Sequence, residues 1–421
     1  MITRIKLENF KCFREVEVNP RLITVFVGPN GSGKSSVLQA MALLKQSAGK
    51  TGLDLNGDLI KFSVVDDINP KFDEASRTKT IGFAGVADQL ELPKLGVDRE
   101  VRYHYEADFS GLRLNTHYGQ VRFKSTIFTF TIRPIDPEEE ATIASTSSSG
   151  LGPHLIHLAP SNTIATIGEM DWGSVPAGLS KDALTILIGA PSSVLKAMRF
   201  VPSARGLVQP SYSLGDKVLD DISSSGGLSQ QEQQIATNLA YTRELENKLS
   251  EWIKKVTEVG LRVNLIPSRT VEIQSTALIG NVNIVAEGFG TNALILLFQQ
   301  LAIASKGATV MIEEPEIHLH PRAQADLASV LAEEAKAEDK QLIMTTHSEH
   351  ILGRFLTLVA EKTLSPDELA IYAFEKDEQG VCTANELEVT EDGRVKGGIK
   401  DFLEPDLDEL ERYLRAMQPS E

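Results

Sequence analysis

The feature that most constrains the fold is the run Gly28-Pro29-Asn30-Gly31-Ser32-Gly33-Lys34-Ser35, which matches the phosphate-binding pattern G-x-x-x-x-G-K-[ST]. It follows an apolar, β-branched run at 22–27 that predicts a buried strand, and it precedes a helical pattern at 37–45. A strand, a glycine-rich turn and a helix in that order direct backbone N–H groups and the positive helix end at a phosphate. We therefore expect a nucleotide site here and disfavour a chance glycine turn.

Each residue type in this run has a predicted role. The glycines let the backbone wrap closely around an anion. Lys34 is expected to reach the β- and γ-phosphates, and the Ser35 hydroxyl is expected to hold Mg²⁺. The predicted nucleotide-contacting residues of the loop are Gly28, Pro29, Asn30, Gly31, Ser32, Gly33, Lys34, Ser35 and Ser36.

A second apolar run, at 309–312, ends in two carboxylates, Glu313 and Glu314. In the second half of a phosphate-loop site, Glu313 would hold Mg²⁺ through water, opposite Ser35. Glu314 would accept a proton from the attacking water or orient it. An acidic exit from a strand is the alternative, but the phosphate loop favours the functional interpretation.

Two further segments complete the predicted site. The apolar run 341–346 ends in His347, at the sheet edge where ligands bind in open α/β sheets, so His347 is a candidate γ-phosphate contact. Gly288-Phe289-Gly290-Thr291-Asn292 precede an apolar helix and form a candidate anion site at its N-terminus. Such glycine turns are common, and this one gains weight from its place upstream of Glu313.

Between these motifs the pattern is rich in β-structure. Alternation at 2–10 and 13–18 predicts two strands, which we expect at an edge of the nucleotide sheet. Lys11 and Arg14 lie in the turn between them and are interpreted as solvated charges rather than contacts to nucleotide or DNA. An antiparallel meander is predicted from strand patterns at 80–84, 101–105, 112–114 and 121–132, with turns at Ser110-Gly111 and Tyr118-Gly119.

Two segments flank this meander. Prolines, acidic residues and a Ser/Thr tract predict an exposed loop or disorder over 134–153. A helix is expected from Ser229 to about Val259, with an apolar stripe that fits a short coiled-coil seam or a packed lid. The lid is favoured because no matching return helix precedes it.

Composition limits the class of protein. The 421 residues exceed what one core usually spans, so two lobes are expected. The net charge of -16 argues against a generally basic nucleic-acid-coating surface, although it leaves a local groove open. No apolar run or signal pattern points to a membrane, and Cys12 and Cys382 suggest no framework by spacing, so a cytoplasmic location is expected. Zinc at His318 and His320 is disfavoured, because a zinc site needs at least three protein ligands.

The order of these motifs resembles a known family. The start LENFKCF at 7–13, the loop GPNGSGKSS, the glycine turn, the run IEEPEIHLHP and the run TTHS resemble ABC-type ATPases of the SMC/RecF class. The resemblance is greatest to compact AAA-family ATPases related to the overcoming lysogenization defect (OLD) proteins. It is specific over 1–46 and 287–352. It implies ATP and Mg²⁺ as ligands, Gly288 to Asn292 as a signature motif capping ATP bound by a second subunit, His318 to Pro321 at the D-loop position, and His347 as the switch histidine.

The expected fold class is α/β, a P-loop NTPase of ABC-ATPase type with an antiparallel β lobe and a mostly parallel core sheet flanked by helices. Residues 1–50 and 260–421 are assigned to the ATPase core. Residues 51–200 are assigned to a β-rich first lobe with an insertion, and 201–259 to a linker and lid helix.

The sequence also departs from the family pattern. The signature lacks the LSGGQ wording, Glu313 stands where most ABC proteins carry aspartate, and the Q-loop is assigned only to candidates Asp66, Asp67 or Asn69. Long coiled-coil arms are absent. After residue 350 about seventy residues follow, too few for the Toprim nuclease of full OLD proteins.

The predicted function is that of an ATP hydrolase that dimerises, or forms a higher homo-oligomer, around nucleotide. It is expected to drive or gate a DNA-related or anti-phage defence complex with a partner effector such as a nuclease encoded nearby. DNA is a possible partner and a membrane is not. The alternative is a nucleotide-switched scaffold with negligible turnover that holds an effector.

Overall fold

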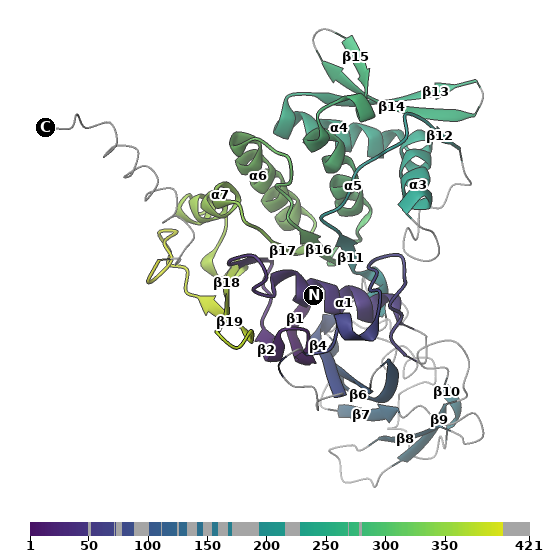
Figure 1. Ribbon diagram of the computed structural model, residues 1–421, viewed down its shortest axis with the longest axis vertical. Coiled ribbons are helices and arrows are strands. Elements are labelled where there is room, and N and C mark those ends of the chain that lie inside the picture. Colours follow the sequence, from purple (N-terminus) through teal and green to yellow (C-terminus); the bar gives the residue numbers. More distant parts are fainter. Residues whose placement is uncertain are drawn as a thin grey trace, which may run out of the picture.

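The computed structural model describes residues 1–48, 52–70, 72, 78–87, 101–110, 112–123, 126–132, 141–145, 154–158, 167–170, 193–214, 228–267, 269–277 and 280–398 (Figure 1). Within these ranges, no helix is both long enough and apolar enough to cross a bilayer.

A mostly parallel sheet forms the centre of the molecule. Its strands run in the order β11 (Arg199–Val201), β16 (Thr309–Glu313), β17 (Gln341–Thr345), β3 (Ile23–Val27), β18 (Leu369–Lys376) and β19 (Cys382–Leu387). All neighbours pair in parallel except β18 and β19, which are antiparallel. The strands β3, β16 and β17 are buried along their whole length, which explains their continuous apolar runs. The predicted core sheet is confirmed.

The two faces of this sheet belong to two hydrophobic cores. Because successive side chains of a strand point to opposite faces, Phe26 joins one core while Val25 and Val27 join the other. The first core also takes in the buried face of α1 (Lys34–Gln46). The second packs under α3 (Leu228–Tyr241), α4 (Arg243–Thr257), α5 (Phe289–Ile303), α6 (Pro321–Ala337) and α7 (Glu349–Ala360). Figure 1 shows α1 beside the N-terminal strands and the other helices on the opposite side.

An antiparallel sheet lies against α1. Its order is β2 (Phe13–Val18), β1 (Ile2–Phe10), β4 (Thr78–Ala87), β5 (Val101–Ser110), β6 (Arg113–Phe123) and β7 (Thr126–Ile132). The predicted meander is present, and Ser110 pairs with Arg113 across the expected first turn. The expected turn at Tyr118-Gly119 is wrong, because both residues pair on both sides within β6.

The expected place of β1 and β2 in the nucleotide sheet is also wrong. The strand β1 pairs with β2 and β4, with Leu7 opposite Val16 and Ile81, and both belong to the antiparallel sheet. The alternation of apolar and polar residues in β1 and β2 correctly predicted that one face of each strand is buried. It does not indicate which strand lies beside them.

Two smaller sheets complete the described structure. One has the order β10 (Ile167–Met170), β9 (His154–Leu158) and β8 (Ala141–Ser145). The exposed loop predicted over 134–153 is therefore wrong at 141–145, and its other residues lie outside the described ranges. The second sheet has the order β12 (Tyr212–Ser213), β14 (Thr270–Ala277) and β13 (Gly260–Ile266), with β15 (Gly280–Asn283) paired to β14.

The predicted long helix is divided in two. Thr242, with extended backbone angles of φ -125° and ψ 92°, separates α3 from α4. The apolar face of α4 packs on α5, where the rings of Trp252 and Phe298 lie 5.3 Å apart at 57°. This face is therefore part of the core rather than a free coiled-coil seam.

Candidate functional site

The phosphate loop connects the carboxyl end of β3 to the start of α1. At two positions of the loop only glycine fits, because φ is positive and a neighbouring atom lies where a Cβ would be. Gly28 has φ 139°, and a Cβ there would lie 2.3 Å from the Phe374 carbonyl oxygen. Gly33 has φ 96°, and a Cβ there would lie 2.7 Å from the Cys12 sulfur. The loop is thus held between the β1–β2 turn and β18, and any side chain at these positions would displace it.

Lys34 is the buried cation of this loop, with 5% of its surface exposed. Its Nζ donates to the carbonyl oxygens of Gly28 (2.7 Å) and Pro29 (2.9 Å). Burial lowers the pKa of Lys34 from its usual range, and nearby Glu314 and Glu316 oppose that shift. The ammonium group is therefore held within the loop by two backbone carbonyls.

Glu313 ends β16 and is buried, with 6% exposed. Its Oε1 accepts from Gln39 Nε2 (3.2 Å), and its Oε2 accepts from the Ser203 backbone N–H (3.3 Å). Burial raises the pKa of this carboxyl above its usual range. The hydrogen bonds from Ser203 and Gln39, and the charge of Lys11, oppose this rise of the Glu313 pKa.

These donors fit Mg²⁺ better than zinc. A serine hydroxyl and a buried carboxylate are oxygen ligands, and Mg²⁺ is commonly held by one or two protein groups together with phosphate and water. In the part of the chain that the structure describes, no group of three His, Cys, Asp or Glu side chains could hold a metal. His320 Nδ1 instead accepts from the Arg322 N–H at the start of α6, and the His318 ring contacts Phe289 edge-on at 4.8 Å.

Glu314 follows β16 directly and faces a cavity of about 490 Å³. Its backbone N–H donates to the Thr345 carbonyl (3.0 Å) at the end of β17. His347 lies two residues beyond Thr345, and its N–H donates to Glu316 Oε1 (2.7 Å). Burial, and then the charge of Lys34, lower the pKa of His347 below its ordinary value. The ring is thus biased toward its neutral form.

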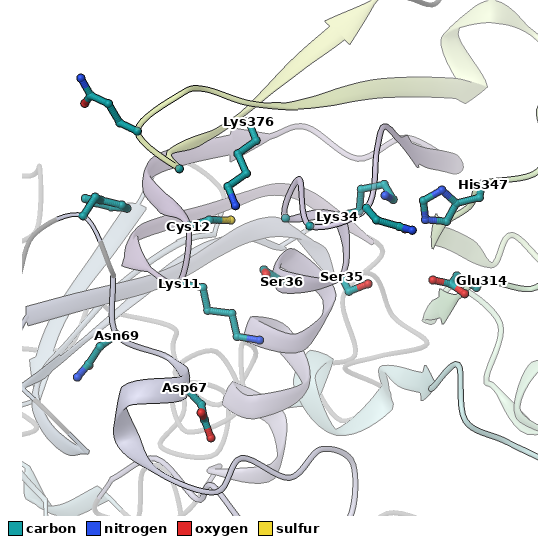
Figure 2. A pocket seen from close by; sticks show the side chains of 16 residues that line it. Lys11, Cys12, Lys34, Ser35, Ser36, Asp67, Asn69, Glu314, His347 and Lys376 are labelled. Atoms are coloured by element: carbon teal, nitrogen blue, oxygen red, sulfur yellow. The ribbon is translucent and has the colours of Figure 1, made fainter. Parts of the chain in front are cut away.

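The cavity brings together Glu314, His347 and part of the predicted loop, whereas Gly28, Pro29 and Ser32 do not line it. Figure 2 shows Lys34, Glu314 and His347 at one end of it. The loop residues that line it are Asn30, Gly31, Gly33, Lys34, Ser35 and Ser36. Glu313 lies behind this lining rather than on it.

Other residues of this cavity were not predicted. Lys11 was interpreted as a solvated charge, but it is half-buried, lines the cavity and donates to Gln39 Oε1. Phe72, Lys376 and Gln379 also line it, and no sequence motif marks them. Of the Q-loop candidates, Asp67 and Asn69 line the cavity, whereas Asp66 accepts from Asn69 Nδ2 (2.9 Å).

Of the predicted signature residues, Phe289 lines a second cavity, of about 530 Å³, whereas Gly288 and Gly290 do not. Helix α5 begins at Phe289, which is 49% exposed, and Gly288 faces open space. Gly290 is buried instead, because a Cβ there would lie 2.5 Å from the His318 carbonyl oxygen. Glu314 lines this cavity as well as the first, so the two cavities meet at one residue.

The fold is similar to that of SMC head domains, and the phosphate loop is that of a P-loop ATPase. A family model described as AAA ATPase domain matches residues 1–87 and 219–352, more than half of the chain, and the chain belongs to this family. It is therefore an ATP-binding ATPase. The resemblance inferred from the motifs is confirmed.

Individual relatives agree with this assignment. The chain is 23% identical over 364 residues to a protein named OLD nuclease from Thermus scotoductus, covering 83% of this chain and 59% of that protein. The SmcHead bound to the C-winged helix domain of ScpA has a TM-score of 0.53 at 15% identity, covering 93% of this chain and 98% of that one. The Smc head with an extended coiled coil, bound to the C-terminal domain of ScpA derived from Pyrococcus furiosus, has a TM-score of 0.50 at 12% identity, with 98% and 99% covered.

Proposed function

We propose that the protein hydrolyses ATP at a site that a second copy of the chain completes, with Glu314 activating the attacking water. The observation that carries this proposal is the position of Glu314 on both cavities. A general base must be within reach of the water it deprotonates. A carboxylate between the phosphate loop and the start of α5 meets that requirement for a γ-phosphate bound there.

The phosphates would be held by this chain's own loop. Its backbone N–H groups and the N-terminus of α1 attract the anion, and Lys34 would leave the carbonyls of Gly28 and Pro29 to contact it. His347, with its lowered pKa, would approach the γ-phosphate as a neutral hydrogen-bond donor. Ser35 and Glu313 would hold Mg²⁺, which neutralises charge on the phosphate oxygens when bound.

The second copy would contribute through the start of α5. Gly288 and Phe289 are exposed there and supply a helix N-terminus that can face a partner's nucleotide. Head-to-tail pairing of two chains would then enclose two nucleotides, and binding energy from ATP would hold the pair together.

We further propose that this ATPase drives or gates a DNA-related or anti-phage defence complex through a partner effector. The support is the relationship to a protein named as a nuclease, of which the chain matches 59%. An effector encoded nearby, such as a nuclease, is the expected partner, and DNA is a candidate partner.

The test is steady-state ATP turnover of Glu314→Gln. The amide keeps the shape of the side chain but cannot accept a proton, so hydrolysis should fall by about two to four orders of magnitude. ATP affinity should persist, because Lys34, Ser35 and Glu313 are unchanged. The matched control is Glu378→Gln, an exposed carboxylate in the β18–β19 turn, which should hydrolyse at the wild-type rate. Wild-type turnover in Glu314→Gln would remove the catalytic assignment, and negligible turnover in the wild type would favour the nucleotide-switched scaffold.

A further inference from the structure

The backbone of Glu314 is in an unusual conformation. It has φ 43°, in the left-handed region that non-glycine residues seldom adopt. Such conformations cost free energy and persist only where the surroundings fix them. The Glu314 N–H donates to the Thr345 carbonyl, and this bond restrains the amide side of the residue. The carbonyl side needs a separate contact.

Arg205 makes that second contact. It lies in the loop after β11, and its Nη1 donates to the carbonyl oxygens of Pro202 (3.0 Å) and Glu313 (2.8 Å). Its Nη2 donates to those of Glu314 (2.9 Å) and Pro315 (3.1 Å). A guanidinium is a rigid planar fork. Three consecutive carbonyls around Glu314 are therefore fixed relative to one plane.

Arg205 is costly to keep where it is. It is 6% exposed, and its Nε has no hydrogen-bond partner among the described residues. Burial lowers the pKa of Arg205 to about 10, opposed by the charges of Glu316, Glu314 and Glu313, so it remains charged at neutral pH. A buried charge is weak evidence for a stabilising role, because desolvation offsets most of its attraction. Its fixed geometry at Glu314 indicates another role.

The same loop is also attached to α5. Leu207 N–H donates to Asn292 Oδ1 (2.8 Å), and Asn292 Nδ2 donates to the Leu207 carbonyl (2.8 Å). At its other end, the Ser203 N–H donates to Glu313 Oε2. Residues 203–207 thus join the start of α5 to the Glu313 carboxylate and, through Arg205, to the backbone carbonyl of Glu314.

We propose that Arg205 is a positioning residue for Glu314, holding its backbone in the left-handed conformation that presents the carboxylate to the nucleotide cavity. Through Leu207 and Asn292 it makes that placement depend on the start of α5. The inference rests on the proposed role of Glu314. Arg205 does not line the cavity beside the phosphate loop, so it is expected to act on turnover rather than on ATP binding.

The test compares Arg205→Lys with Arg21→Lys. Lysine keeps the charge but cannot donate to these carbonyls from one rigid plane, so kcat should fall about 10- to 100-fold, as for a small misplacement of a reacting group. The dissociation constant for ATP should change less than about twofold, since the loss lies in the transition state. Arg21 is the matched control, because its Nη1 holds the Pro366 and Leu369 carbonyls (both 2.9 Å) elsewhere on the core sheet. Arg21→Lys should keep the wild-type kcat.

A double-mutant cycle separates positioning from an independent effect. In the Glu314→Gln background, Arg205→Lys should reduce the residual turnover no further, because its target is already lost. A full additional loss, or wild-type kcat in Arg205→Lys while Glu314→Gln is inactive, would overturn the inference and leave the proposed function intact. Active Glu314→Gln would instead overturn the proposed function itself. Should circular dichroism find Arg205→Lys unfolded, Arg205→Gln, with two N–H donors and no charge, is assayed by the same criteria.

Discussion

The two cavities that meet at Glu314 differ in how exposed their side chains are within a single chain. Beside the phosphate loop, the cation Lys34 is 5% exposed and hydrogen-bonded within the loop. Beside α5, Phe289 is 49% exposed and Val208 is 65% exposed. Exposed apolar side chains at a cavity rim are typical of interaction surfaces. The difference supports the proposal that this chain builds the phosphate-binding half by itself and that the other half belongs to an interface.

Lys34→Ala is expected to have the largest effect on the phosphate-binding half. Removing the one buried cation of the loop should weaken ATP binding about 10²- to 10³-fold, as for the loss of one preorganised donor to a developing or bound anion. Calorimetry on the folded variant measures this. Lys376→Ala is the control, since this exposed lysine lines the same cavity at its rim and should change the affinity far less. Wild-type affinity in Lys34→Ala would contradict a self-sufficient phosphate-binding half.

His347 belongs to the same half, and its expected effect, on the pH dependence of the free energy of unfolding, is smaller. Its pKa is lowered in the folded protein, so between the folded pKa and the ordinary value of 6.5 the unfolded state binds more protons. Stability should therefore rise with pH through that window and level off above it. His347→Gln cannot titrate and should lack this rise. Urea unfolding from about pH 5 to about pH 8 measures the difference, and a difference independent of pH would be inconsistent with the lowered pKa.

The same histidine reports on Lys34. Because the charge of Lys34 lowers the pKa of His347, Lys34→Met should move that pKa back toward its ordinary value, which NMR titration can follow. An unchanged pKa would mean that burial alone accounts for the shift.

Much of the phosphate-binding half could be predicted from the sequence. The loop is contiguous and its spacing is fixed by the geometry of anion binding. Glu314 and His347 each follow an apolar run, and the carboxyl ends of neighbouring parallel strands necessarily meet at one edge of the sheet. Local sequence patterns were therefore sufficient to predict that these residues, distant in the chain, lie close together.

The rest of the site could not be predicted, because it depends on tertiary contacts that no local sequence pattern indicates. Arg205 is a single arginine in a loop, and its role appears only when β11 pairs with β16 and brings it to Glu314. Gly290 looked like an open glycine of a signature, but the His318 carbonyl packs against it. Lys11 looked solvated because the sequence does not tell that the β1–β2 turn lies against the phosphate loop.

If a second copy of the chain completes the site, the mass of Glu314→Gln should differ with and without ATP and Mg²⁺. Light scattering should report a doubling, or a larger assembly if the free protein already associates, because a ligand that binds only the assembled form stabilises it by mass action. Adding Phe289→Asp in that background should abolish the shift, since a carboxylate on this exposed position would face the partner's phosphates. An unchanged mass at saturating ATP would contradict the claim and leave a nucleotide site that works within one chain.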